Sequence, residues 1–218
     1  MTAVTTTFVD KDKTAFLTQQ ARTLAPGIVA YGNVMPNTSG LIRDIETLVS
    51  LKQLVWSPGQ QGSGTESKDG TVDKSIRDVE VMSLPPFQKT PAFRLHGGAE
   101  EVLSNKLDEV LLPLLQRYQD SNGVGGKLDN EGWQILKYGV GQHFGRHSDH
   151  SKHYPRTVSV SFYLNDDYKG GELEFDAFNV VHPPVANEAV FFPSSYVYTH
   201  RVHPVTAGVR YCVVGWFY

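Results

Sequence analysis

The segment from Trp133 to Tyr218 consists of short runs of alternating apolar and polar residues, each ended by turn residues. This spacing is typical of an antiparallel β-sandwich or barrel. The whole chain of 218 residues contains 11 Phe, 10 Tyr, 20 Gly and 12 Pro, which favours strands joined by turns. We therefore expect a mainly β protein.

The residues before Trp133 alternate between helical and extended patterns. In chain order we expect a short helix (12–24), a strand (26–35), a helix capped by Asn37 or Thr38 (37–52), a short strand (53–57), a loop (58–75), a strand (76–84) and a helix interrupted or kinked at Pro113 (99–119). We expect one domain over residues 1–218, in which 1–132 support a β core formed by 133–218.

Charge and composition count against several classes of protein. The formal net charge is −3 and Lys and Arg do not cluster, so we expect no nucleic-acid partner. No apolar run approaches the ~20 residues that span a bilayer, and the first residues lack the pattern of a secretory signal. A single cysteine, Cys212, allows neither an internal disulfide nor a cysteine-based zinc site. We expect no membrane partner and a cytoplasmic location.

His147 and Asp149 are two residues apart, within a stretch unusually rich in histidine. In an extended chain both side chains leave the same face, and histidine with a carboxylate suits a divalent metal such as Fe(II). The pattern also fits a polar surface loop, and a metal needs a third ligand. The candidates are His150, His153, His182, His200 and His203.

The segment 198–218 is interpreted as a hairpin that turns near Ala207. In that register His200 and Arg210 share a face, about four residues apart or roughly 13 Å, while His203 points to the other face. A small dicarboxylate that chelates the metal could reach Arg210, whose guanidinium binds a carboxylate through two hydrogen bonds.

The strand predicted over 156–165 has one apolar face and one uncharged polar face. The polar face contains Ser159, Ser161 and Tyr163 and fits either solvent or a lined cavity. Near His200 and Arg210, the cavity is the preferred interpretation.

Four motifs together resemble one family. They are YGVGQHFGRHSD (138–149), RTVSVSFYLN (156–165), GGELEF (170–175) and HRVHPVTAGVRYCVVGWF (200–217). In this order they resemble the iron(II)- and 2-oxoglutarate-dependent dioxygenases, in particular the prolyl 4-hydroxylase-like branch. The resemblance is strong over residues 133–218. Before residue 133 it concerns only the order of helices, strands and a long loop. It implies a double-stranded β-helix, or jelly-roll, core.

The resemblance implies roles for individual residues. His147, Asp149 and His200 would be the catalytic metal triad. Arg210 and Tyr163 would hold the 5-carboxylate of 2-oxoglutarate, and Tyr138 and Ser159 would line the same pocket. Arg156 and Trp216 match positions near the substrate in relatives. Phe144 departs from the pattern, because relatives often have a tyrosine there, so a polar contact at that position is not carried over.

The resemblance also implies an activity. The cofactors would be Fe(II), 2-oxoglutarate and O2, with ascorbate as a further candidate. The reaction would hydroxylate a C–H bond, with a prolyl residue of a peptide or protein as the expected substrate, and release succinate and CO2. The loop 58–75 would be a mobile finger that closes over the peptide, or a functionless insertion. The alternatives are the same chemistry on a free amino acid or small metabolite, a non-catalytic metal- or 2-oxoglutarate-binding sensor, and a nucleic-acid demethylase.

Overall fold

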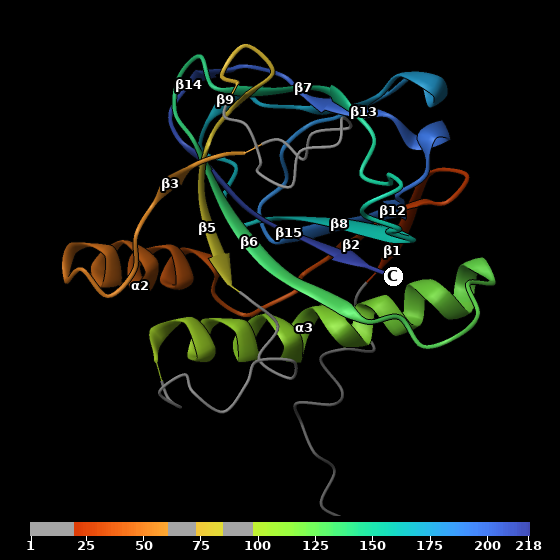
Figure 1. The fold of residues 1–218 in the computed structure, drawn as a ribbon, viewed down its shortest axis with the longest axis horizontal. Coiled ribbons are helices and arrows are strands. Elements are labelled where there is room, and N and C mark those ends of the chain that lie inside the picture. The colour runs from red at the N-terminus through yellow and green to blue at the C-terminus, as the bar shows by residue number, and fades with distance from the viewer. Residues whose placement is uncertain (1–19, 61–72, 85–97) are drawn as a thin grey trace, which may run out of the picture.

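The computed structural model describes residues 20–60, 73–84 and 98–218. Two antiparallel sheets face each other, and both long helices lie on the outer side of the larger sheet (Figure 1). This arrangement confirms the expected mainly β fold with flanking helices.

The larger sheet has eight strands. Their order across the sheet is β1 (Ala21–Ala25), β2 (Ile28–Gly32), β12 (Glu188–Pro193), β8 (Val158–Tyr163), β15 (Arg210–Phe217), β6 (Asn130–Tyr138), β5 (Glu80–Leu84) and β3 (Ser57–Pro58). The central strand β8 is buried along its whole length, because one face meets the helices and the other meets the smaller sheet.

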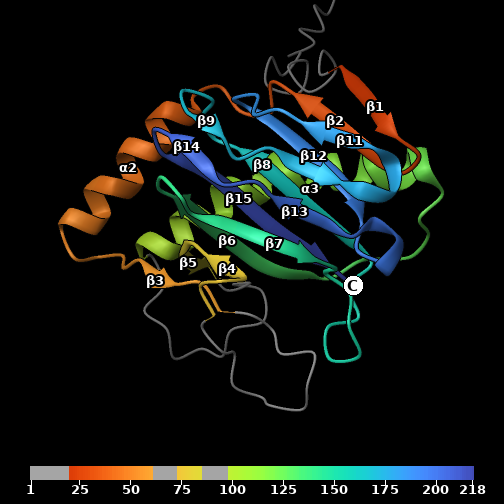
Figure 2. The same cartoon turned by 90° about the horizontal axis from the view of Figure 1, so that it is seen from above.

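The smaller sheet has five strands and lies across the larger one when the molecule is viewed from above (Figure 2). Their order is β11 (Val180–His182), β10 (Leu173–Phe175), β13 (His200–Val202), β7 (His143–His147) and β4 (Arg77–Asp78). The additional pair is β9 (Lys169–Gly170) and β14 (Val205–Ala207), and the two 3-10 turns are η3 (Asp176–Phe178) and η4 (Tyr196–Tyr198).

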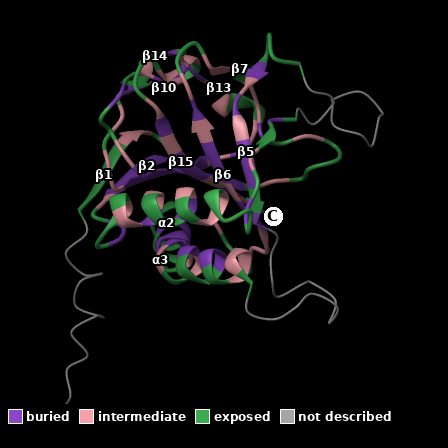
Figure 3. Cartoon of the chain, turned by 90° about the vertical axis from the view of Figure 1, so that its left-hand side faces the viewer, coloured by how far each residue is buried: buried purple, intermediate pink, exposed green. Residues whose placement is uncertain are grey.

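The helices α2 (Thr38–Ser50) and α3 (Ala99–Asn122) bury their apolar faces against the larger sheet (Figure 3). Asn37 caps α2 as expected, because its side-chain oxygen accepts a hydrogen bond from the backbone N–H of Gly40 at 2.8 Å. The helix α3 continues through Pro113 and ends at Gly123 in the left-handed conformation (φ 67°). No helix in the described ranges has the length and apolar character needed to cross a bilayer.

The C-terminal hairpin expected from the sequence is wrong. The strand β13 pairs with β7 and β10 in the smaller sheet, whereas β15 pairs with β6 and β8 in the larger sheet. The segment between them, β14, pairs with β9. His200 and Arg210 therefore approach the same cavity from two facing sheets, and not along one face of a hairpin.

Several local expectations also need correction. The helix expected over 12–24 is wrong where the chain is described, because Ala21–Ala25 form β1 and pair with β2. Only Ser57 of the strand expected over 53–57 is in a strand. His182, a candidate third ligand, lies in β11 and is buried, with its Nε2 atom 2.7 Å from Oε1 of Glu188 on β12 and not beside the other ligands. Most of the loop 58–75, residues 61–72, lies outside the described residues.

Candidate active site

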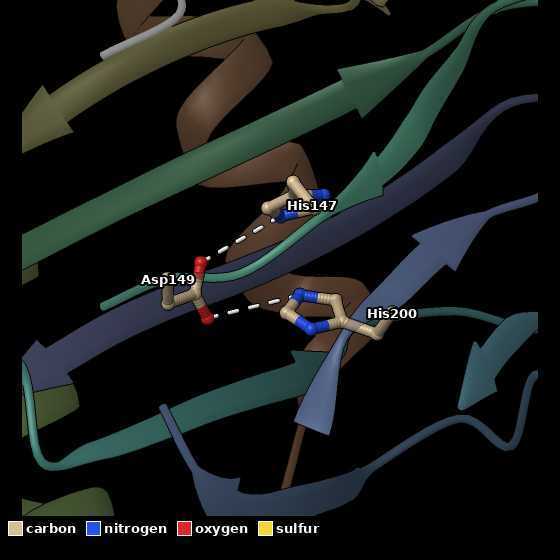
Figure 4. A group of neighbouring side chains, drawn as sticks. All are labelled: His147, Asp149 and His200. Carbon is tan, nitrogen blue, oxygen red and sulfur yellow. Dashed lines mark ion pairs between the residues drawn. The ribbon is translucent and has the colours of Figure 1, made fainter. Parts of the chain in front are cut away.

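His147, Asp149 and His200 come together at one edge of the smaller sheet. His147 ends β7, His200 begins β13, and the two residues are direct partners in the pairing of these strands. One ligand atom of each of the three side chains lies within 4.8 Å of the others. The Nε2 atoms of His147 and His200 are 3.6 Å and 3.7 Å from the two carboxylate oxygens of Asp149 (Figure 4). The spacing fits a single metal ion bound by two imidazoles and a carboxylate.

Backbone carbonyls orient both imidazole rings. The Nδ1 atom of His147 is 2.8 Å from the Gly145 carbonyl oxygen, and that of His200 is 3.0 Å from the Tyr198 carbonyl oxygen. A ring that donates from Nδ1 keeps the lone pair of Nε2 free for a metal. Burial and the neighbouring His147 lower the pKa of His200 to about 4, so its ring is neutral and ready to bind a metal at neutral pH.

Two serines hold the carboxylate between the histidines. The Ser159 hydroxyl donates to Oδ2 of Asp149 at 2.6 Å and lies 2.7 Å from the Ser194 hydroxyl. Burial alone would raise the pKa of Asp149. At the acid pH at which this carboxylate would titrate, His200 and His147 are protonated, and their charges together with the hydrogen bond from Ser159 outweigh burial and hold the pKa of Asp149 well below its usual range. The carboxylate is thus ionised and fixed in rotation, as a metal ligand requires.

A pocket extends from this group between the two sheets, with about 430 Å³ of space not filled by protein atoms, part of which is open to solvent. Arg210 lies on its wall, is 1% exposed, and pairs with Tyr138 of the neighbouring strand β6. The guanidinium carbon of Arg210 lies 4.8 Å from the ring centre of Tyr138 and 5.2 Å from that of Tyr163. A buried cation beside two phenols, across a pocket from a metal-type triad, suits a ligand with a carboxylate at its far end.

Unpartnered polar atoms support that fit. Among the described residues, Nε and Nη1 of Arg210 and the hydroxyls of Tyr138 and Tyr163 have no hydrogen-bond partner although they are buried. Such groups are costly in a folded protein, and a bound carboxylate would satisfy them.

The polar face of β8 lines the cavity, as preferred from the sequence. Ser161 borders the pocket, and Ser159, on the same face, holds Asp149. Val158, Val160 and Phe162 belong to the opposite core beneath the helices.

Arg156 stacks on the indole ring of Trp216 near the pocket. The guanidinium of Arg156 lies 3.9 Å from the ring centre of Trp216 and 4.8 Å from that of Tyr154. It donates two hydrogen bonds of 2.6 Å to the carboxylate of Glu131. Trp216 borders the pocket, whereas the charge of Arg156 is already paired.

The other histidines lie apart from the triad. His150 and His153 are exposed in the loop after Asp149, and His143 is hydrogen-bonded at the surface. His203 pairs with Glu174. Cys212 is buried and borders the pocket, on the same face as Arg210. Phe144, the departure from the family pattern, stacks on His147 with ring centres 3.6 Å apart.

The sequence did not predict the burial of Arg77, which borders the pocket, or of Tyr168, which lies beside Arg210. Arg77 is buried, borders the pocket and stacks on Phe144 at 4.8 Å. Arg77 lies two residues before Val79 and four before Val81, so side-chain alternation along a strand could have placed all three on the inner face. Tyr168 lies in the turn after β8, and its buried hydroxyl also lacks a partner among the described residues.

Comparisons with known proteins agree with this geometry. Residues 133–218 match the family model of the 2OG-Fe(II) oxygenase superfamily. A PKHD-type hydroxylase from Synechococcus sp. strain CC9902 is 32% identical over 136 residues, which are 59% of this chain and 56% of that protein. A PKHD-type hydroxylase from Psychrobacter sp. strain PRwf-1 is 26% identical over 190 residues, which are 80% of this chain and 63% of that protein. The chain thus spans a little over half of the length of these relatives.

Solved structures share the fold. A prolyl hydroxylase from Trichoplax adhaerens, in complex with a hypoxia-inducible factor peptide fragment, superimposes with a TM-score of 0.70 at 20% identity and covers 89% of this chain and 84% of its own. A Pseudomonas putida prolyl-4-hydroxylase gives a TM-score of 0.60 at 24% identity, over 88% of this chain and 93% of its own. These likenesses confirm the double-stranded β-helix expected from the sequence.

Proposed function

Since residues 133–218 match the family model of the 2OG-Fe(II) oxygenase superfamily, we propose that this chain is an iron(II)- and 2-oxoglutarate-dependent dioxygenase that hydroxylates a prolyl residue of a peptide or protein. The observation that carries the proposal is the joint presence of a metal-type triad and a buried arginine in one pocket. The peptide substrate is supported by the fold shared with prolyl hydroxylases, one of them in complex with a peptide. The cytoplasmic location stays a prediction.

His147, Asp149 and His200 would hold the metal from one side, which leaves the side facing the pocket for the cosubstrate and oxygen. When bound, Fe(II) with 2-oxoglutarate and O2 supplies oxidative decarboxylation to succinate and CO2, coupled to hydroxylation of a C–H bond. Ascorbate is an additional reductant in this proposal. The remaining work of the chain is binding, orientation and exclusion of water.

Arg210 and Tyr163 would bind the 5-carboxylate of 2-oxoglutarate, with Tyr138 on the neighbouring strand as a further donor. The two sheets bury these groups and keep bulk water from the carboxylate, which strengthens each hydrogen bond to it. Ser159 acts on the metal side, where it fixes the Asp149 carboxylate.

The target side chain would enter beside Trp216. Glu131 neutralises Arg156 and keeps its guanidinium flat against the indole. An apolar ring such as that of proline can pack on an aromatic wall of this kind without losing a hydrogen bond.

Two alternatives keep the same pocket. The first is hydroxylation of a free amino acid or another small molecule, and the second is a sensor that binds metal and 2-oxoglutarate without turnover. Arg210, whose Nε and Nη1 are buried without a partner among the described residues, supports binding of 2-oxoglutarate, and turnover separates the enzyme from the sensor.

The test is succinate formation from 2-oxoglutarate with Fe(II) and air, measured with a library of proline-containing peptides and matched peptides in which alanine replaces proline. We expect a proline peptide to stimulate succinate formation, with a mass gain of one oxygen on that peptide. His147→Ala should abolish turnover, and Arg210→Lys should raise the KM for 2-oxoglutarate because lysine lacks the bidentate fork. Arg201→Lys is the matched control, since Arg201 is 44% exposed and pairs with Glu174 on the outer surface.

Decarboxylation that no peptide stimulates, but that free proline or another small molecule does, would favour the first alternative. Binding of iron and 2-oxoglutarate without succinate would favour the sensor.

A further inference from the structure

A third buried tyrosine lies at Arg210 besides Tyr138 and Tyr163. Among the described residues, the hydroxyl of Tyr168 has no hydrogen-bond partner, and the same holds for the hydroxyls of Tyr138 and Tyr163 and for Nε and Nη1 of Arg210. Five polar atoms of one buried cluster therefore lack a well-formed hydrogen bond, although Arg210 lies close enough to interact with all three phenols. Structures tolerate a few such atoms across a domain, so a concentration at one place indicates a ligand.

Tyr168 and Arg210 meet at Gly171. A Cβ atom added to Gly171 would lie 3.0 Å from Cε2 of Tyr168 and 3.1 Å from Cδ of Arg210. The charge of Arg210 is also the strongest electrostatic influence on Tyr168. The phenol and the guanidinium thus belong to one local group.

The chain makes room for this phenol at two glycines. Gly171 (φ +68°) lies against the ring, and a Cβ atom on Gly208 (φ +79°) would lie 3.0 Å from Cβ of Tyr168. Asn165 fixes the start of the turn, because its side chain donates to the Val209 carbonyl and accepts from the Tyr211 N–H, both at 2.8 Å. The position of Tyr168 is therefore fixed by the turn and not by the pairing of a strand.

The chemistry of the cluster matches a carboxylate. Burial raises the pKa of Tyr168, although Arg210 opposes the shift, so the phenol stays protonated and can donate. A carboxylate offers two oxygens with about four acceptor sites, enough for the guanidinium and additional phenols. Burial also raises the pKa of Tyr138, to about 12, so this hydroxyl is a donor as well.

We propose that Tyr168 is a cosubstrate-binding residue that donates its phenolic hydrogen to the distal carboxylate of 2-oxoglutarate, in addition to Arg210 and Tyr163. The inference rests on the proposed function, because it assigns a further donor to the same cosubstrate. Its consequence is selectivity, since a cluster with so many donors favours a dicarboxylic 2-oxoacid over a monocarboxylic one of equal length.

The experiment measures binding without turnover. Calorimetry of the full chain with Mn(II) in place of Fe(II) gives the Kd for 2-oxoglutarate and for 2-oxopentanoate, which lacks the distal carboxylate. Tyr168→Phe keeps the ring and removes only the hydroxyl. The matched control is Tyr211→Phe, because Tyr211 follows Arg210 in β15 and donates its hydroxyl to Glu46 at 2.8 Å.

We expect Tyr168→Phe to weaken 2-oxoglutarate binding roughly tenfold, which corresponds to about 1.4 kcal/mol. Binding of 2-oxopentanoate should not change, and Tyr211→Phe should bind both compounds as the wild type does. Without cosubstrate, Tyr168→Phe should unfold at the same or a higher temperature, because it loses an unsatisfied buried hydroxyl. The rise in Tm on adding 2-oxoglutarate should be smaller than in the wild type.

Equal 2-oxoglutarate affinity in Tyr168→Phe and wild type would overturn the inference and leave the proposed function intact. A weaker affinity for both compounds, with a lower Tm without cosubstrate, would also overturn it, because Tyr168 would then act only through packing. A wild-type chain that binds Mn(II) but no 2-oxoglutarate would overturn the proposed function and the inference together.

Discussion

Removal of the Ser159 hydroxyl should weaken metal binding although Ser159 is not itself one of the three ligands. In Ser159→Ala the 2.6 Å hydrogen bond to Oδ2 of Asp149 is lost, and Ser194 loses its 2.7 Å contact. The side chain is 1% exposed, so water cannot easily replace the hydroxyl. The carboxylate then rotates more freely between His147 and His200.

The magnitude follows from the kind of hydrogen bond. A hydrogen bond to a charged group contributes about 1.5–3 kcal/mol. Loss of a partner that orients a metal ligand typically lowers metal affinity by about 10–100-fold. Since about 1.4 kcal/mol corresponds to tenfold in Kd, the two figures agree, and we expect a 10–100-fold rise in the Kd for the metal.

The assay is calorimetric titration with Mn(II) in the absence of 2-oxoglutarate. Ser161→Ala is the matched control, because Ser161 lies two residues further along the same face of β8 and also borders the pocket. The control should bind the metal as the wild type does. An unchanged Kd in Ser159→Ala, or equal losses in both variants, would refute the argument that Ser159 orients Asp149.

Two further variants test the fold around the site. Gly215→Ala should lower Tm by the equivalent of about 1–3 kcal/mol, because the added Cβ overlaps the ring of Trp133; an unchanged Tm in thermal unfolding would contradict this packing. Burial alone would raise the pKa of Glu188, but hydrogen bonds from His182 and Arg22 lower it below its ordinary 4.5. This carboxylate therefore adds stability above pH 4.5 that is lost as the pH falls through its folded-state pKa. In denaturant titrations over that range, Glu188→Gln should be less stable at neutral pH and lose less stability on acidification, and a parallel pH profile would refute the assignment.

The sequence was sufficient to predict that Ser161 and Arg210 face a cavity, but not how the chain brings them there. Side-chain alternation depends only on the local backbone, so the sequence alone predicted which face of β8 is polar. The position of Arg210 opposite His200 depends on which strands pair, and the short segment Val205–Ala207 pairs with β9 instead of extending a hairpin. Long-range pairing of this kind leaves no periodic trace in the sequence.

The sequence did not predict the burial of Tyr168 and Arg77, for two different reasons. Tyr168 stands in the polar, glycine-rich segment 165–171, which has the composition of a turn, and its burial arises from Gly171 and Gly208 far apart in the chain. Arg77 is a charged residue in a short strand, where the usual expectation is exposure. Its stacking on Phe144 appears only when β4 pairs with β7.

His200 and His147 are direct partners in the pairing of β13 with β7. Metal binding therefore depends on the correct register of these two strands. A slip of one residue between these strands would turn one imidazole to the other face of the sheet and leave an incomplete set of ligands. Only the correctly aligned chain can then gain stability from the ion, in proportion to the logarithm of its concentration over Kd. Availability of metal in the cell would in this way select the properly paired barrel while it forms.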